Sequence, residues 1–184
     1  MARLMNIASP GAPSAATGFD TPIALLKECH RRVEDQCETL ARLVPHLATH
    51  GSTAAAAEAA AAVLRYFELA APKHHADEED DLLPALFESV AGSDAVCLRE
   101  MADGLLADHE ALARQWQALR AVLRAVVDHQ PARLEAAAVQ AFAEHYRAHI
   151  ALEEGELFPM AERWLSAQTL EAIGRTMRRR RGEG

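Results

Sequence analysis

The stretch HHADEEDDLLP at residues 74–84 is matched, 75 residues later, by HIALEEGELFP at residues 149–159. Each copy carries a histidine, a glutamate four residues after it and a proline ten residues after it. Residues at positions i and i+4 lie one turn apart on the same face of an α-helix. The repeat therefore predicts two helices that each present one His–Glu pair. These pairs are His74 with Glu78, and His149 with Glu153.

A second repeat, with a spacing of 79 residues, relates His30 to His109. Both histidines have apolar neighbours at positions −4, +3, +7 and +10. Apolar residues at spacings of three and four form one face of an amphipathic helix, so each histidine is expected on a buried face. The chain is thus interpreted as two related helical hairpins. In each hairpin one helix carries a single histidine and the other carries a His–Glu pair.

Helix caps, prolines and apolar periodicity predict four long helices with short turns between them. A proline disfavours the α conformation of the residue before it, so Pro84 and Pro159 are expected to end the second and fourth helices. A shorter helix is expected around residues 161–175. The long helices are predicted over residues 22–50, 54–84, 95–128 and 130–159. This pattern predicts an all-α, up-down-up-down four-helix bundle with a short C-terminal helix.

Composition agrees with a helical bundle and excludes several classes of protein. Alanine, the residue with the best helix propensity, is the most frequent residue, and only 5% of residues are aromatic. A net charge of −8 argues against a nucleic-acid-binding protein. No apolar run is long enough to span a membrane. Three cysteines without a CxxC motif suit a reducing compartment, so a cytoplasmic location is expected.

The predicted domain organisation has three parts. Residues 1–19 contain several prolines and glycines and no continuous apolar region, which predicts a disordered tail and not a signal peptide. Residues 20–162 form the bundle, and residues 163–184 form the C-terminal helix and an arginine-rich tail. The run Arg178–Arg181 is expected to be solvated.

The four histidines are expected at one level of the bundle. His74 and His149 each lie about 15 Å before the proline of their helix, at 1.5 Å per residue. His30 and His109 lie about 12 and 20 Å after the starts of theirs. Two buried carboxylates without partners would be very costly, and two metal cations would offset that cost. Imidazole and carboxylate donors suit iron, manganese or zinc.

At these residues the sequence resembles the hemerythrin-like (HHE cation-binding) family over about residues 20–160. The resemblance implies a non-haem di-iron centre: two Fe ions with a bridging oxo or hydroxo group, both glutamates bridging, and open positions for a small diatomic ligand or peroxide. The oxygen-carrying invertebrate members have a fifth histidine in an HxxxH motif on the third helix, which this chain lacks. His145, one turn before His149, is a candidate fifth histidine. The implied metal ligands are His30, His74, Glu78, His109, His149 and Glu153.

Several alternatives stay open. Oxygen binding or sensing is favoured, because neither an extra cysteine-bearing domain nor an output domain is apparent in the chain. Defence against nitrosative or oxidative stress with iron–sulfur repair is one alternative, and a metal-free structural bundle is another. Whether the protein is an enzyme, its protein partner and its oligomeric state are left open. The ExxH pairs of ferritin-like proteins and the HExxH motif of zinc proteases are absent.

The register of the second helix also has an alternative. A shift by one residue would use His75 and Glu79 in place of His74 and Glu78. The internal repeat disfavours this shift, since His75 aligns with Ile150. We therefore expect His75 at the boundary of the helix and away from the ligand face.

Overall fold

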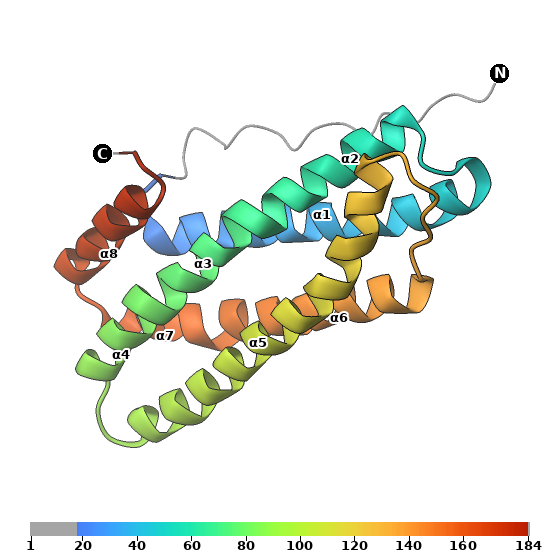
Figure 1. The fold of residues 1–184 in the computed structure, drawn as a ribbon. Coiled ribbons are helices and arrows are strands. Elements are labelled where there is room, and N and C mark those ends of the chain that lie inside the picture. Colours follow the sequence, from blue (N-terminus) through green and yellow to red (C-terminus); the bar gives the residue numbers. More distant parts are fainter. Residues whose placement is uncertain (1–17, 184) are drawn as a thin grey trace.

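The computed structural model describes residues 18–183, which form four helical rods and one further helix (Figure 1). Two rods are single helices, α1 and α5, and two are built from several helical segments. Successive rods run in opposite directions, so the predicted all-α, up-down-up-down four-helix bundle is confirmed. The helices are α1 (Pro22–His50), α2 (Ala54–Arg65), α3 (Ala71–Asp77), α4 (Leu83–Ser89), α5 (Ser93–Val127), α6 (Ala136–Leu152), α7 (Phe158–Trp164) and α8 (Ala167–Arg180).

Three π-helical turns join the segments of the second and fourth rods. They are η1 (Tyr66–Ala70), η2 (Glu78–Leu82) and η3 (Glu153–Leu157). A proline follows each turn two residues after its end. These prolines are Pro72, Pro84 and Pro159. Because proline lacks an N–H and its ring clashes with the carbonyl four residues earlier, it disfavours a regular α-turn before it. A wider turn accommodates the ring, and the rod continues.

The prediction that Pro84 and Pro159 end their helices is therefore wrong. The second rod continues to Ser89 and the fourth to Trp164. The helix predicted at residues 161–175 lies further along the chain as α8, and the fourth rod begins at Ala136, a few residues after its expected start. Pro72, Pro84 and Pro159 each follow a widened turn, and the rod continues past them. The expectation that proline ends a helix does not include this effect.

The apolar core is divided into two clusters along the bundle. One cluster includes Phe67, Trp116 and Phe142, and the other includes Leu105 and Phe158. Histidine and glutamate side chains occupy a buried polar layer between them. This layer is the common level that helix rise alone predicted for the histidines.

Helix α8 packs on the outside of the bundle against α1, α3 and η2 (Figure 1). Gly174 allows this close approach, since a Cβ atom at this position would overlap the carbonyl oxygen of Phe19. Phe19 belongs to the segment predicted as a disordered tail, yet it is half-buried here. The remainder of that predicted tail, residues 1–17, lies outside the described residues.

The C-terminal arginines hold α8 to the bundle. Arg180 and Arg181 both donate hydrogen bonds to the carboxylate of Asp77, which is fully buried, and Arg180 also contacts Asp81 at 2.7 Å. We call Arg180, Arg181 and Asp77 the arginine latch. A buried carboxylate requires a counter-charge, so the expectation of a solvated tail is wrong for these two arginines. Arg178 is exposed, as expected.

Among residues 18–183, no helix combines the length and the apolar composition needed to cross a bilayer.

Candidate metal centre

The six predicted ligands converge from all four rods into the buried polar layer. Each is at most 6% exposed. The two glutamates are the first residues of the π-turns η2 and η3, so the turn geometry sets where their carboxylates lie. π-turns inside α-helices are frequent at functional sites. The converging side chains are His30 from α1, His74 from α3, Glu78 from η2, His109 from α5, His149 from α6 and Glu153 from η3.

The donor atoms form two overlapping groups. In each group, one donor atom from every residue lies within 4.8 Å of the others. The first group holds His30 and His74, which we call the first histidine pair. The second holds His109 and His149, the second histidine pair. Glu78 and Glu153 belong to both groups.

Each glutamate directs one oxygen toward each histidine pair. The Oε1 atom of Glu78 lies 3.4 Å from Nε2 of His74, and its Oε2 atom lies 3.7 Å from Nε2 of His109. The Oε2 atom of Glu153 lies 3.0 Å from Nε2 of His30, and its Oε1 atom lies 3.0 Å from Nε2 of His149. Two carboxylates shared in this way can bridge two cations, one at each histidine pair.

Carboxylates outside the layer hold the outward nitrogen of two of these histidines. Glu154 lies 2.8 Å from Nδ1 of His30, and Glu79 lies 2.6 Å from Nδ1 of His109. A carboxylate at Nδ1 fixes the proton there and leaves the Nε2 lone pair directed inward, which is the usual support for a metal-binding histidine. The sequence shows a signal for both residues, because Glu79 directly follows Glu78 and Glu154 directly follows Glu153 in the repeat.

Asp108 has a similar relation to the second histidine pair. Its Oδ2 atom lies 3.6 Å from Nδ1 of His149, and its Oδ1 atom lies 3.2 Å from Nε2 of His145. The other nitrogen of His145 lies 3.2 Å from Gln115. Within the described chain, His145 belongs to neither donor group. It therefore contacts the aspartate beside the centre and not the centre itself, and its predicted role as a fifth ligand has no support in this geometry.

The two buried carboxylates have opposite electrostatic environments. Burial, followed by the charge of Glu153, raises the pKa of Glu78 well above its ordinary value. Burial also opposes ionisation of Glu153, but the nearby imidazoles of His149 and His30 lower its pKa below the ordinary value. Without cations, Glu78 would therefore hold a proton more tightly than Glu153.

Burial also governs the protonation of the histidines. It lowers the pKa of His74 well below 6.5, and together with His149 it lowers the pKa of His109. Burial acts in the same direction on His149, but the nearby carboxylate of Glu153 outweighs it and raises the pKa of His149. Neutral imidazoles are the form that binds metal, so His74 and His109 are in that form at neutral pH.

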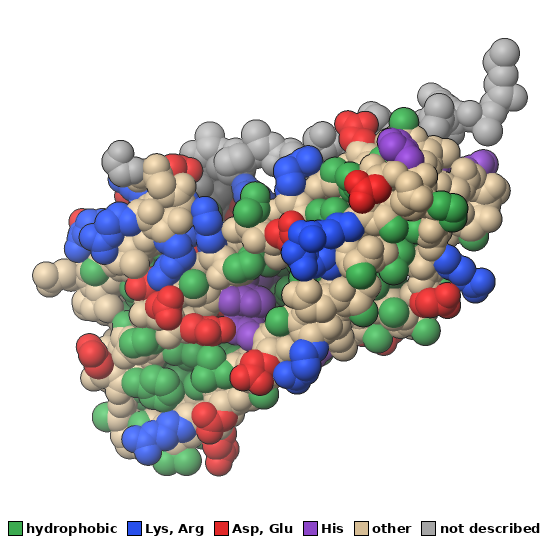
Figure 2. Space-filling model, in the orientation of Figure 1, with side chains coloured by type: hydrophobic (Ala, Val, Ile, Leu, Met, Phe, Trp, Pro, Cys, Tyr) green, Lys and Arg blue, Asp and Glu red, His purple; other side chains and the backbone are tan. Residues whose placement is uncertain are grey.

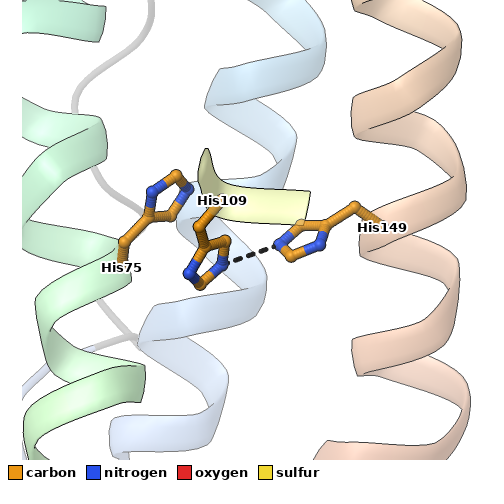
Figure 3. Close-up of side chains that lie close together, drawn as sticks. All are labelled: His75, His109 and His149. Atoms are coloured by element: carbon orange, nitrogen blue, oxygen red, sulfur yellow. Dashed lines mark hydrogen bonds between the residues drawn. The ribbon is translucent and has the colours of Figure 1, made fainter. Parts of the chain in front are cut away.

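Two observations show that a cation fits between these side chains. The carboxylate oxygens of Glu78 and Glu153 are buried and have no hydrogen-bond partner. The Nε2 atoms of His109 and His149 lie 3.1 Å apart (Figure 3). Two ligands at right angles on one ion, each with a bond of about 2.1 Å, are separated by about 3.0 Å. The separation of these two nitrogens is therefore one that a shared cation would accept.

His75 lies closer to the centre than the sequence suggested. Its ring stacks on His109 with centroids 3.9 Å apart and planes 7° from parallel. His75, His109 and His149 converge from three different rods (Figure 3), and one nitrogen of each lies within 4.8 Å of the others. His75 is half-buried, as expected of a residue at the boundary of the helix. The expectation that it lies away from the ligand face is wrong, because its ring packs against His109 from the facing rod.

Comparison with known proteins agrees with this geometry. Residues 21–161 match the family model described as the hemerythrin HHE cation binding domain. The chain belongs to the hemerythrin HHE family. An uncharacterized protein of Haemophilus influenzae is 36% identical over 169 residues, which cover 92% of this chain and 95% of that protein.

Membership explains the buried polar layer in this hemerythrin HHE domain. The matched region contains all four rods and all six converging side chains. The family binds cations, and a bound cation would supply the positive charge that the carboxylate oxygens without partners require. The buried His–Glu cluster is thus the part of the domain that fits a metal site.

Proposed function

We propose that this domain holds two iron ions, with a bridging oxo or hydroxo group, and binds a small diatomic ligand or peroxide. The single observation that carries the proposal is the placement of Glu78 and Glu153. Each directs one oxygen to each histidine pair. Two bridging carboxylates in a four-helix bundle are typical of di-iron and di-manganese proteins. The proposed ligands are His30, His74, Glu78, His109, His149 and Glu153.

Iron, when bound, would supply reversible two-electron exchange with O2, NO or peroxide. The residues of the chain orient and shield the centre. Glu154 and Glu79 hold the rings of His30 and His109. Phe158, which is fully buried, stacks on His30 with centroids 5.4 Å apart and excludes water from the first histidine pair.

Reversible binding or sensing of oxygen is the favoured role within this proposal. Each histidine pair provides two imidazoles and shares two carboxylates, which leaves coordination positions for an external ligand. The proposed setting is the cytoplasm, since three cysteines without a CxxC motif suit a reducing compartment. Defence against NO or peroxide would use the same centre and differs in whether the ligand is consumed.

Metal analysis and an absorption spectrum of the aerobically purified protein test the proposal. We expect two irons per chain and the near-ultraviolet absorption of an oxo-bridged diferric centre. A His74→Ala variant is expected to lose iron and thermal stability. Purified protein without metal, together with an unchanged melting temperature in the variant, would contradict the proposal and favour a metal-free bundle.

Rapid mixing of the reduced protein with O2 or NO separates binding from turnover. A stable oxygenated form would support oxygen binding or sensing. Rapid consumption of the ligand, with return to the starting spectrum, would instead support a role in stress defence.

A further inference from the structure

His75 has a buried nitrogen with nothing bound to it. Its Nε2 atom is shielded from solvent and has no hydrogen-bond partner. The internal repeat has Ile150 at the equivalent position, so His75 is not needed to build the two histidine pairs. A buried polar atom without a partner destabilises a protein unless something else satisfies it.

The stacking geometry argues against His75 as a fifth metal ligand. The lone pair of an imidazole nitrogen lies in the plane of its ring, so a bound ion lies close to that plane. The rings of His75 and His109 are stacked 3.9 Å apart with planes only 7° from parallel. Two such planes do not meet at one ion. In this arrangement His109 can bind a metal through Nε2 while His75 faces the same space from one side.

A surface groove leads to His75. It has a volume of about 560 Å³, lies between the second rod and α5, and reaches His75 on its inner side. Histidine side chains are visible from outside between α3 and α5 (Figure 2). Aromatic residues form much of its wall, and Glu68 and Arg120 are paired at 2.5 Å along it. The aromatic wall residues are Phe67, Trp116 and Tyr146.

Described residues cover the first histidine pair. Phe158 covers His30, and the arginine latch holds α8 over the rod that carries His74. The groove instead leads to His75, whose ring stacks on His109 of the second histidine pair. A molecule in the groove would therefore approach the centre at the second histidine pair.

We propose that this groove admits a ligand of two or three atoms to the second histidine pair, and that the imidazole N–H of His75 donates a hydrogen bond to it. The separation of the three histidine nitrogens, within 4.8 Å, leaves room for only a few atoms. The inference rests on the proposed function, because it requires a metal at His109 and His149. His75 then selects ligands that carry a hydrogen-bond acceptor, such as small anions.

Azide binding to the oxidised, iron-loaded full-length protein tests this role, with absorbance titration as the measurement. His75→Phe keeps a ring on His109 and removes the nitrogen. We expect unchanged iron content and azide affinity lower by about tenfold, the value of one hydrogen bond to a charged group. His75→Gln, which retains a donor, is expected to recover most of the affinity. His50→Phe, at an exposed site, is the matched control and is expected to change neither quantity.

A second variant tests the route and does not depend on His75. Ala113 is exposed and lines the groove, so Ala113→Trp fills the groove without entering the core. We expect slower azide association at unchanged iron content. Unchanged association in this variant would overturn the groove as the entrance.

Two results would overturn the role of His75. Loss of about one iron per chain in His75→Phe would show that His75 is a ligand, and an azide affinity equal to that of the unchanged protein would show that it makes no hydrogen bond. The iron content and azide binding of the unchanged protein distinguish a failure of this inference from a failure of the proposed function. If it holds no iron pair, both fail; if it holds the pair and binds azide, only the comparison of variants decides the inference.

Discussion

Replacing Glu78 with glutamine is expected to stabilise the metal-free protein and to weaken metal binding. Glu78 is 1% exposed and both of its oxygens lack hydrogen-bond partners. Glutamine has nearly the same shape and cannot ionise. The metal-free protein therefore loses an unfavourable buried charge, while the metal-bound protein loses a negative bridging ligand.

The effect on the metal-free protein depends on pH. Burial and the charge of Glu153 raise the pKa of Glu78 in the folded state above 4.5. The folded state thus binds this proton more tightly than the unfolded state, and the resulting stability is complete below pH 4.5. It is lost as the pH rises through the raised pKa. The Glu78→Gln variant has no carboxyl group to ionise at this position and does not lose stability in this way. Its stability relative to the unchanged protein therefore increases between pH 5 and pH 8.

The expected magnitude follows from the cost of a buried polar group without a partner. At pH 8 the metal-free variant should be more stable by about 1–3 kcal/mol. For a chain of this size each kcal/mol corresponds to roughly 2–4 °C in melting temperature. With metal bound, the unchanged protein is expected to be more stable than the Glu78→Gln variant. A metal present at 100 times its dissociation constant stabilises the folded protein by about 2.7 kcal/mol, and the variant loses most of that gain.

Urea unfolding at pH 5 and pH 8 measures these differences, first with a chelator and then with ferrous iron under anaerobic conditions. Glu156→Gln, at an exposed position of the π-turn η3, is the matched control and should change neither stability nor iron content. A metal-free Glu78→Gln variant that is less stable than the unchanged protein at pH 8 would refute the reasoning. So would a stability difference that is the same at both pH values.

Three further predictions follow from contacts around the centre. Glu79→Gln should lower iron affinity by about 10–100-fold, measured by competition with a chelator, because the ring that it holds loses a carboxylate partner. Replacing Arg180 and Arg181 with alanine should cost about 3–5 kcal/mol in urea unfolding, because the buried aspartate of the latch loses its counter-charges. Gly174→Ala should speed amide hydrogen exchange in α8, whereas Gly155→Ala, whose added methyl contacts nothing, should not.

Helix rise and periodicity were enough to predict the main features of the site. Apolar spacing placed His30 and His109 on buried faces, and the repeated His–Glu pairs placed the carboxylates one turn from His74 and His149. These properties depend on the geometry of single helices, which sequence spacing determines directly. The structure brings all six side chains into one layer, as that reasoning required.

The positions of His75 and of the arginine latch could not be predicted in this way. Both depend on which side chains from distant parts of the chain meet. His75 is placed by its stacking on His109, and Arg180 and Arg181 are placed by a buried aspartate about 100 residues earlier. Neither contact has a local pattern in the sequence.

Residue spacing alone was enough to predict the four helical rods, their inward faces and the six converging donors, because a helix converts residue spacing into direction. How each glutamate shares its two oxygens between the histidine pairs, and how the first histidine pair is covered, became apparent only from the packing of the rods. These features arise from the π-turns at Glu78 and Glu153 and from the packing of Phe158 and α8. They depend on distances between rods, which the spacing of residues within one rod does not specify.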